Sequence, residues 1–410
     1  MSQPLTEHLE HFHNAARLNL FFRARLAARG IAVDTIDIVR VQHRPKAGVT
    51  GVYRVRGSMG GRAIEHHYGM TTESLTAQER HDVVQTHYAG IPVSVWRHPT
   101  DPRLPGLPLA TDPGTLCALW PDAFPTAGEL DLSWRTYRPL RRAVLHAQYG
   151  AQEAYLKVLT LKRAGRLGHI HRIMADAKVP TARLVGEPKA GIVPLAALPG
   201  RPMTDYLFSW NPDVLDRALP LAELVQVLDD LPTELTTLRP RSAWADGIGA
   251  FTRSAAAAFP HLAPRLRRVR KHLRKRLAKT DRGPVVPTHG DFYEANIFLT
   301  EGPDQSLRFS GLLDLDTMGP GHRVDDLACL LGHLAVLPSV HPDYRRIEPL
   351  TARWWQVCAG LVDERALQLR AAAVALTLIA GTKHAPAHKA ASIAEQRLTA
   401  VEEILEGKRA

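Results

Sequence analysis

Cysteine is scarce in this sequence, with three residues in 410. Cys117, Cys329 and Cys358 share no short metal-ligand spacing, and so few thiols cannot make a disulfide framework. The sequence also lacks any run near 18 consecutive apolar residues, the length that a membrane-spanning helix needs. Its start is polar and acidic, where a secretory signal has a basic and then an apolar stretch. These absences predict a cytoplasmic protein with no membrane partner.

The composition is otherwise that of a basic globular protein, with 45% hydrophobic residues, 23% charged residues and a net charge of +11. The densest positive charge is RLRRVRKHLRKRLAK, residues 265–279, where apolar residues recur every three or four positions. We interpret this segment as an amphipathic surface helix, with contact to RNA, DNA or a membrane as the alternative. No aromatic is interleaved to stack on bases, so the sequence does not favour a nucleic-acid partner.

The first 120 residues are expected to form an N-terminal accessory domain. Helical spacing covers Leu9 to Arg29, and three β-rich pieces typical of a small antiparallel sheet follow at Ile36–Val41, Val52–Arg56 and Ala63–Tyr68. The five prolines of HPTDPRLPGLPLATDP, residues 98–113, predict an extended connector.

Residues 121–202 are expected to form a second domain. It has two strand-like runs, TYRPLRRAVLHAQYG and EAYLKVLT, joined by a turn at Tyr149 and Gly150. A helix over Arg166–Ala177 and short strands at Ala182–Gly186 and Gly191–Leu195 follow.

Residues 203–410 are expected to form a third, mainly helical domain. Helical spacing is clearest at Leu221–Leu231, Arg265–Leu277 and Leu367–Ala380. A non-helical island from VVPTHGDFYEANIFLT to FSGLLDLDTMGPG interrupts the helices and reads as loop, strand, turn and strand.

Two basic Arg-Pro turns leading into strands echo each other along the chain, QHRPKAGVTGVYRVRG and TYRPLRRAVLHAQYG. Domain duplication and chance explain this echo equally well. If the first domain is a degenerate copy of the second, Met70 stands where the second copy has Lys157.

The island carries the residues with the clearest chemistry. His289 to Asn296 reads HGDFYEAN, and Asp314-Leu315-Asp316 begins eighteen residues later. Phosphoryl transfer requires an acceptor oxygen in line and neutralised phosphate charge. One carboxylate can accept the hydroxyl proton, while an amide oxygen and a second carboxylate can hold Mg²⁺. A lone HGD would more simply be a loop with a helix-capping aspartate, but the ordered combination favours an ATP site.

HGDFYEAN resembles the HGDxxxxN motif of the aminoglycoside phosphotransferase and choline kinase family, relatives of the protein kinases. The resemblance implies that Asp291 is the catalytic base, that Asn296 is a magnesium ligand and that Asp314 is the principal ligand between metal and nucleotide phosphates. His289 would brace the loop, and Asp326, in the later DLA, would steady it. Asp316 is either a second metal ligand or a polar loop residue.

The resemblance extends back to about residue 130. EAYLKVL is similar to the third strand of a kinase small lobe, whose Lys157 would contact the α- and β-phosphates, although a lysine at a strand end is often only solvated. PLAALPGRPMTDYL is similar to the interlobe hinge, whose backbone at Leu195, Ala196, Ala197 and Leu198 would bind adenine.

The fold implied is α+β and protein-kinase-like, with a small antiparallel β lobe and a large helical lobe, preceded by a small α/β N-terminal domain. That extra domain is similar to one fused to some bacterial kinases of the maltokinase-like branch. ATP and Mg²⁺ would be the cofactors, and the partner a small-molecule hydroxyl acceptor such as a sugar or aminoglycoside.

Two departures from the kinase pattern stand out. There is no GxGxxG loop, and basic residues of the turn near Arg141 and Arg142 would bind phosphate instead. The helix RLGHIHRIMADA has no glutamate to pair with Lys157, although His171 or Asp176 could substitute. The alternative function is therefore a nucleotide-binding pseudokinase or scaffold without transfer activity.

Overall fold

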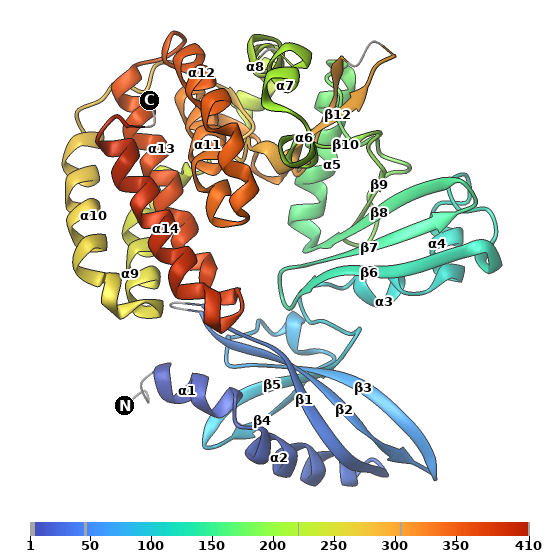
Figure 1. The fold of residues 1–410 in the computed structure, drawn as a ribbon. Coiled ribbons are helices and arrows are strands. Elements are labelled where there is room, and N and C mark those ends of the chain that lie inside the picture. Colours follow the sequence, from blue (N-terminus) through green and yellow to red (C-terminus); the bar gives the residue numbers. More distant parts are fainter. Residues whose placement is uncertain (1–4, 45–46, 220, 304–305, 409–410) are drawn as a thin grey trace. The chain divides into compact units, whose positions relative to one another are not determined.

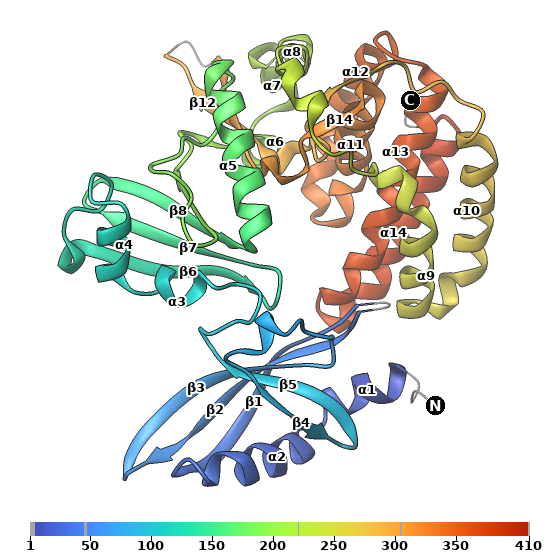
Figure 2. The same cartoon turned by 180° about the vertical axis from the view of Figure 1, so that it is seen from behind.

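The computed structural model describes residues 5–44, 47–219, 221–303 and 306–408. The chain divides into two compact units, one of residues 1–168 with 184–197 and the other of residues 169–183 with 198–410. Figures 1 and 2 show the elements of each unit from opposite sides. The division into three domains stays a prediction.

The first unit begins with a five-stranded antiparallel sheet in the order β1-β2-β3-β5-β4. The helices α1 (Leu5–Phe12) and α2 (Ala15–Ala27) precede it, and α2 packs on the sheet through Leu18, Phe22 and Leu26 (Figure 1). The strands are β1 (Ile31–Arg44), β2 (Gly48–Met59), β3 (Arg62–Thr71), β4 (Val84–Tyr88) and β5 (Ile91–Arg97).

The sheet prediction for this region is confirmed but incomplete. The three predicted strands exist and are longer than expected, whereas β4 and β5 were missed because β4 is an edge strand with few buried side chains. The single predicted helix is two helices, since the Asn14 side chain caps α2 by accepting a hydrogen bond from the Arg17 backbone N–H at 3.0 Å.

The prediction of an extended connector over residues 98–113 is wrong. The segment contains α3 (Leu107–Ala110) and leads into α4 (Pro113–Leu119), and it buries Leu104 and Leu107 in the core of the next sheet. Pro108 and Pro113 lie in the first turns of these helices, where a missing N–H costs no hydrogen bond.

That next sheet has four antiparallel strands in chain order. These are β6 (Leu130–Arg138), β7 (Arg142–Tyr149), β8 (Gln152–Leu159) and β9 (Ile192–Ala196), with α5 (Leu161–Asp176) between the last two. The turn at Tyr149 and Gly150, the helix and the strand at β9 are confirmed. The strand expected over residues 182–186 is wrong, because only an isolated bridge between Leu184 and Leu195 forms there.

The strand pairings of the two sheets show which positions would be equivalent if the first domain were a copy of the second. Arg44 pairs with Gly48 in the first sheet, as Arg138 pairs with Arg142 in the second. Two positions further along, Val144 lies opposite Lys157, and Thr50 lies opposite Thr71. Duplication stays a prediction, and by this register Thr71 rather than Met70 takes the place of the lysine. Pro45 and Lys46 of the first turn lie outside the described residues.

The second unit is mainly helical, as the sequence predicts. Its helices are α6 (Met203–Ser209), α7 (Pro212–Ala218), α8 (Leu221–Asp229), α9 (Ile248–Ala258), α10 (Ala263–Leu277), α11 (Arg323–Val336), α12 (Glu348–Ala359), α13 (Glu364–Ile379) and α14 (Ala387–Leu405). The helix α13 is buried on nearly every side and packs against α9, α11 and α14 (Figures 1 and 2).

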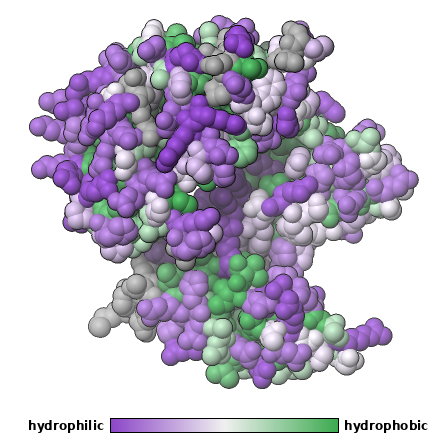
Figure 3. Space-filling view, viewed as in Figure 1, coloured by the Kyte–Doolittle hydropathy of each residue, from purple (hydrophilic) through white to green (hydrophobic). Residues whose placement is uncertain are grey.

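The basic helix α10 docks on this unit by its apolar face. Leu266, Val269 and Leu273 are buried, and Arg265 pairs with Glu402 of α14 at 2.6 Å. The outer surface on this side of the unit is hydrophilic (Figure 3). The interpretation as an amphipathic surface helix is confirmed.

The non-helical island between α10 and α11 is also confirmed. It contains β11 (Val285–Thr288), β12 (Ile297–Glu301), β13 (Leu307–Leu312) and β14 (Gly319–His322), and β12 also pairs with the short β10 (Arg201–Pro202). Because β11 pairs with β14 and β12 with β13, the loop after β11 and the loop after β13 are tied together. Among the described residues, no helix is long and apolar enough to cross a membrane.

Candidate active site

The loop from His289 to Asn296 begins where β11 ends and is hydrogen-bonded to the start of α11. Asp326, fully buried in the first turns of α11, accepts hydrogen bonds from the backbone N–H groups of His289 at 2.8 Å and Gly290 at 2.7 Å. Burial raises the pKa of Asp326 to about 7, although the two N–H donors oppose this shift. The arrangement fits the predicted steadying role of Asp326.

His289 links this loop to the segment after β13. Its Nδ1 faces the Asp291 backbone N–H at 3.3 Å, and its Nε2 lies 3.0 Å from the Leu313 carbonyl oxygen. The first contact requires Nδ1 to accept, so Nε2 carries the proton and donates. Complete burial lowers the pKa of His289 to about 4, which keeps the ring neutral in this role. The geometry fits the predicted brace.

Asp291 and Asn296 lie at the two ends of the segment that leads to β12, and Asp291 is partly exposed whereas Asn296 is buried. The Asn296 side-chain Nδ2 donates to the Asp291 carbonyl oxygen at 2.9 Å, so Oδ1 is the side-chain atom that could act as the predicted metal ligand. The Asp291 carboxylate Oδ1 accepts from the indole N–H of Trp244 at 3.0 Å. Sequence reasoning missed Trp244, because it lies 47 residues earlier in a short 3₁₀ turn with no motif around it.

Asp314 follows β13 in the left-handed conformation, with φ of 61°. This region is uncommon for a side chain other than glycine, and aspartate is among the residues that tolerate it. Both backbone groups of the preceding Leu313 are hydrogen-bonded. Its N–H donates to the Asn296 carbonyl oxygen at 2.8 Å, and its carbonyl accepts from His289. Asp314 is thereby held beside the catalytic loop, and Asp316 lies partly exposed in the next turn.

The described residues contain no cluster of three or more His, Cys, Asp or Glu side chains able to hold a metal ion. Magnesium needs fewer protein ligands, because it keeps several waters and binds substrate phosphates as well. An amide oxygen at Asn296 and carboxylates at Asp314 and Asp316 are hard oxygen donors of the kind that it prefers. The residues present therefore fit Mg²⁺.

The interior of the catalytic loop is packed rather than solvated. Tyr293 stacks on His333 of α11 with ring centroids 4.1 Å apart. Glu294 is 3% exposed, and burial raises its pKa to about 8, so its carboxyl is mostly protonated at neutral pH. Both side chains therefore pack inside the loop.

Gly290 is the point of the loop that a side chain cannot occupy. Its φ is +77°, and a Cβ there would lie 2.9 Å from the Thr317 carbonyl oxygen. We expect Gly290→Ala to destabilise the protein by about 1–3 kcal/mol and to lower turnover at least tenfold, because the loop must shift.

Thermal unfolding and turnover of the variant would check this expectation. Gly283→Ala is the matched control, since Gly283 has φ of +72° and open space around it. Equal losses in both variants would mean that backbone strain alone, and not the contact with Thr317, limits the site.

The turn between β6 and β7 carries the predicted phosphate-binding arginines. The backbone of Leu140, with φ of +62°, is held by its N–H donating to the Asp101 carboxylate at 2.9 Å. Burial, and then repulsion from Arg44, Arg163, Arg138 and Arg142, lowers the pKa of Arg141. A bound anion would relieve this repulsion, so the cluster suits phosphate.

Asp101 is itself braced by Tyr137, whose hydroxyl donates to it at 2.8 Å, and Tyr137 packs against His98 with ring centroids 4.6 Å apart. Burial lowers the pKa of His98 to about 4, below the value of about 6.5 in an unfolded chain. The stabilisation from a neutral His98 is complete above pH 6.5 and is lost as the pH falls toward 4, because only the unfolded chain takes up the proton.

We therefore expect His98→Phe, which keeps the ring packing, to lose less stability on acidification than the wild type. The difference between pH 7 and 4 should reach about 1–3 kcal/mol, and chemical unfolding of the full chain at several pH values would measure it. His81→Gln, at an exposed position, is the control. Parallel pH profiles for wild type and His98→Phe would contradict the expectation.

Lys157 and the first two predicted hinge residues, Leu195 and Ala196, lie in the same small sheet. Lys157 is 8% exposed in β8, and Leu195 and Ala196 end β9 beside it. The Ala197 N–H donates to the Glu153 carbonyl oxygen at 2.9 Å, and the boundary of the compact units falls between Ala197 and Leu198. Roles in binding ATP stay predictions for all of these residues.

The helix α5 contains no glutamate, as the sequence shows. The structure buries His171, at 4% exposure, and leaves Asp176 exposed. Replacement of the missing glutamate by His171 or Asp176 stays a prediction.

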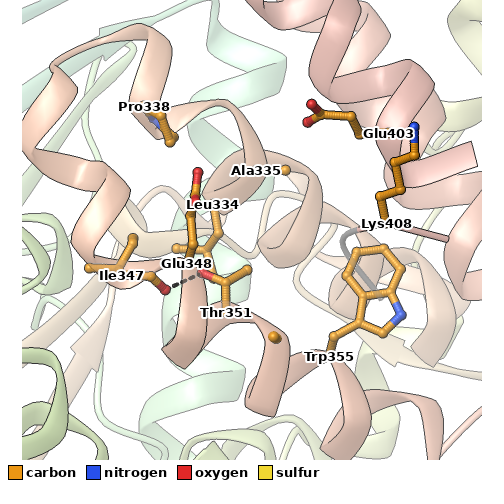
Figure 4. A pocket seen from close by; sticks show the side chains of 10 residues that line it. Leu334, Ala335, Pro338, Ile347, Glu348, Thr351, Trp355, Glu403 and Lys408 are labelled. Carbon is orange, nitrogen blue, oxygen red and sulfur yellow. Dashed lines mark hydrogen bonds between the residues drawn. The ribbon is translucent and has the colours of Figure 1, made fainter. Parts of the chain in front are cut away.

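Two pockets of the helical unit differ in their relation to this chemistry. One, of about 410 Å³, is lined by Gly290 and Thr317 of the two loops. The other, of about 300 Å³, lies among α11, α12 and the end of α14 and includes Thr351 and Trp355 (Figure 4). Neither lining includes a predicted site residue, but the first pocket adjoins Asp291 through Gly290 and through Trp244, whose indole N–H donates to the Asp291 carboxylate at 3.0 Å.

Comparison with known proteins finds a family match and similar folds. Residues 158–361 match the model of the phosphotransferase enzyme family. No curated protein sequence matches the chain significantly.

Among solved structures, an aminoglycoside phosphotransferase APH(4)-Ia variant bound to AMP-PNP and hygromycin B is 14% identical, with a TM-score of 0.50, and covers 71% of this chain and 98% of its own. An ethanolamine kinase from Plasmodium vivax is 13% identical over 71% of this chain and 86% of its own, with a TM-score of 0.43. Spectinomycin phosphotransferase APH(9)-Ia is 12% identical over 68% and 93%, with a TM-score of 0.47.

The first of these structures shows that the predicted protein-kinase-like fold is correct. Neither the family match nor these structures point to the maltokinase-like branch, which stays a prediction.

Proposed function

Because the chain belongs, through residues 158–361, to the phosphotransferase enzyme family, we propose that it transfers the γ-phosphoryl group of ATP to a hydroxyl of a small molecule. Asp291 accepts the proton of the attacking hydroxyl. Asn296 and Asp314 hold Mg²⁺, with Asp316 as a further ligand. The metal, when bound, neutralises charge on the phosphates, and the chain's residues orient the reactants and hold the proton.

The observation that carries the proposal is the frame of hydrogen bonds that joins the loop after β11 to the loop after β13. His289 links the Asp291 backbone to the Leu313 carbonyl, and the Leu313 N–H returns to the Asn296 carbonyl. Such a frame fixes the base and the metal ligands relative to one another before substrate arrives. Positioning of this kind supplies most of the catalysis in phosphoryl transfer.

The nucleotide is assigned to the small four-stranded sheet and its hinge. Lys157 contacts the α- and β-phosphates, the arginines of the β6–β7 turn add positive charge in place of a glycine-rich loop, and the backbone from Leu195 to Leu198 binds adenine. The mutual repulsion of the arginines around Arg141 supports this assignment.

A pseudokinase that binds nucleotide without transferring phosphate is the second candidate, favoured by the absence of a glutamate in α5. Incubation of the protein with ATP, Mg²⁺ and a panel of sugars, polyols, aminoglycosides and amino alcohols separates the two. A product heavier by one phosphoryl group, formed only with Mg²⁺, is the expected result. Nucleotide binding without such a product on any acceptor would favour the pseudokinase.

A further inference from the structure

The pocket of about 410 Å³ in the helical unit adjoins the proposed base. Gly290 and Thr317 of the two catalytic-site loops line it, and so does Trp244, whose indole N–H donates to the Asp291 carboxylate at 3.0 Å. A molecule in this pocket therefore lies next to the group that would take its hydroxyl proton. The pocket is a candidate site for the acceptor.

One wall of the pocket is aromatic. Trp244 is 37% exposed, and its ring lies 5.8 Å from that of Phe251, which also lines the pocket. Large flat aromatic rings suit ligands that have an apolar face and a hydroxylated edge. Sugar rings have this character. An exposed tryptophan can also attract a cation, so the charge of the surrounding groups decides between the two.

The carboxylates in the pocket wall are already neutralised by arginines. Asp325 pairs with Arg282 at 2.9 Å and closely with Arg370, and Asp246 pairs with Arg370 at 3.2 Å and with Arg282 at 3.5 Å. Arg370 is 2% exposed, so this network is built into the wall. A polycation would have to compete for these acids with the buried Arg370 and the partly exposed Arg282.

The other acidic residues that could have attracted a cation do not line this pocket. Asp229, Asp230 and Glu234 are exposed, and Asp229 is paired with Arg323 at 2.6 Å. Arg241, in contrast, lines the pocket and makes no hydrogen bond or ion pair to any residue that the structure describes. Its guanidinium is available for a carboxylate or phosphate of a ligand.

We infer that this pocket binds the acceptor, and that the acceptor is a hydroxylated ring without positive charge: a neutral or acidic sugar rather than a cationic antibiotic or amine. The inference rests on the proposed function and deepens it by naming the acceptor class. Trp244 has two roles in this inference. The sugar ring stacks on its indole, and its N–H positions the Asp291 carboxylate.

The first test separates these two roles of Trp244. Trp244→Phe keeps a ring and loses the N–H, so we expect the KM of the acceptor to change less than about threefold while kcat falls about 3- to 10-fold. Trp244→Ala loses both, and KM should rise about 10- to 100-fold with a fall in kcat. Trp134→Ala, at an exposed tryptophan of β6, is the matched control.

The second test varies the charge of the acceptor on one ring. Glucose, glucuronate and glucosamine are compared as acceptors, together with neutral disaccharides, kanamycin and ethanolamine. We expect phosphorylation of neutral or acidic sugars at a kcat/KM at least tenfold above that of the amines. Arg241→Gln should raise KM for an acidic sugar more than for its neutral counterpart.

Nucleotide binding, measured in parallel by calorimetry, separates the two possible failures. If MgATP binds and amines or aminoglycosides are the preferred acceptors, or if only acceptors other than sugars are phosphorylated, the inference is overturned while the proposed function survives. A sugar acceptor whose KM is unchanged in Trp244→Ala also overturns it, because the pocket is then elsewhere. If MgATP does not bind, the proposed function fails and the inference fails with it.

Discussion

Replacing Asp291 by asparagine is expected to lower the turnover of phosphoryl transfer by about 10²- to 10⁴-fold, the usual contribution of a positioned general base. Asparagine has the same shape, and its side-chain oxygen can still accept the hydrogen bond that Trp244 donates to Asp291. It cannot take up a proton from the attacking hydroxyl. The loss should therefore appear in kcat, with little change in acceptor KM.

The stability of the variant decides how that loss is interpreted. The loop is held by His289, Asp326 and the Asp291 backbone rather than by the Asp291 carboxylate, so the free energy of unfolding should change by less than about 1 kcal/mol. Steady-state kinetics and chemical unfolding are measured on the same preparation, with Asp122→Asn, at an exposed loop position, as the control. Equal turnover in wild type and Asp291→Asn would refute the role of Asp291.

The sequence predicted which loops carry the candidate site better than it predicted the residues that support those loops. HGDFYEAN and DLD follow directly from strands, so their spacing along the chain is enough to bring Asp291, Asn296 and Asp314 onto neighbouring loops. Trp244 is different, because its contact with Asp291 depends on how a distant 3₁₀ turn packs against the loop. No local pattern of residues encodes such a contact.

The same distinction holds for the fold. The helices with a regular apolar stripe, such as α10, were predicted because burial follows the period of the helix. The proline-rich segment after β5 was misread, because proline in the first turn of a helix looks the same in sequence as proline in an extended chain. What decided its structure was the burial of Leu104 and Leu107 against a sheet that comes later in the chain.

A second large effect is expected from Asp314→Asn, which should weaken the binding of ATP in the presence of Mg²⁺ at least tenfold. Asparagine also tolerates the left-handed conformation seen at Asp314, so the backbone after β13 is preserved. The variant removes the negative charge that a bound magnesium ion would face. Alanine at this position would mix the loss of a ligand with backbone strain, since its φ would also be near 61°.

Calorimetric titration with ATP, with Mg²⁺ and then with EDTA, isolates the contribution of the metal. We expect wild type and Asp314→Asn to bind ATP with similar weak affinity in EDTA, and to differ only when Mg²⁺ is present. Asp316→Asn is measured alongside, because a comparable loss would make Asp316 a second ligand and no loss would make it a polar loop residue. If Mg²⁺ strengthens ATP binding equally in wild type and Asp314→Asn, then Asp314 does not hold the metal, and the phosphate charge must be neutralised by Lys157 and the arginines of the β6–β7 turn.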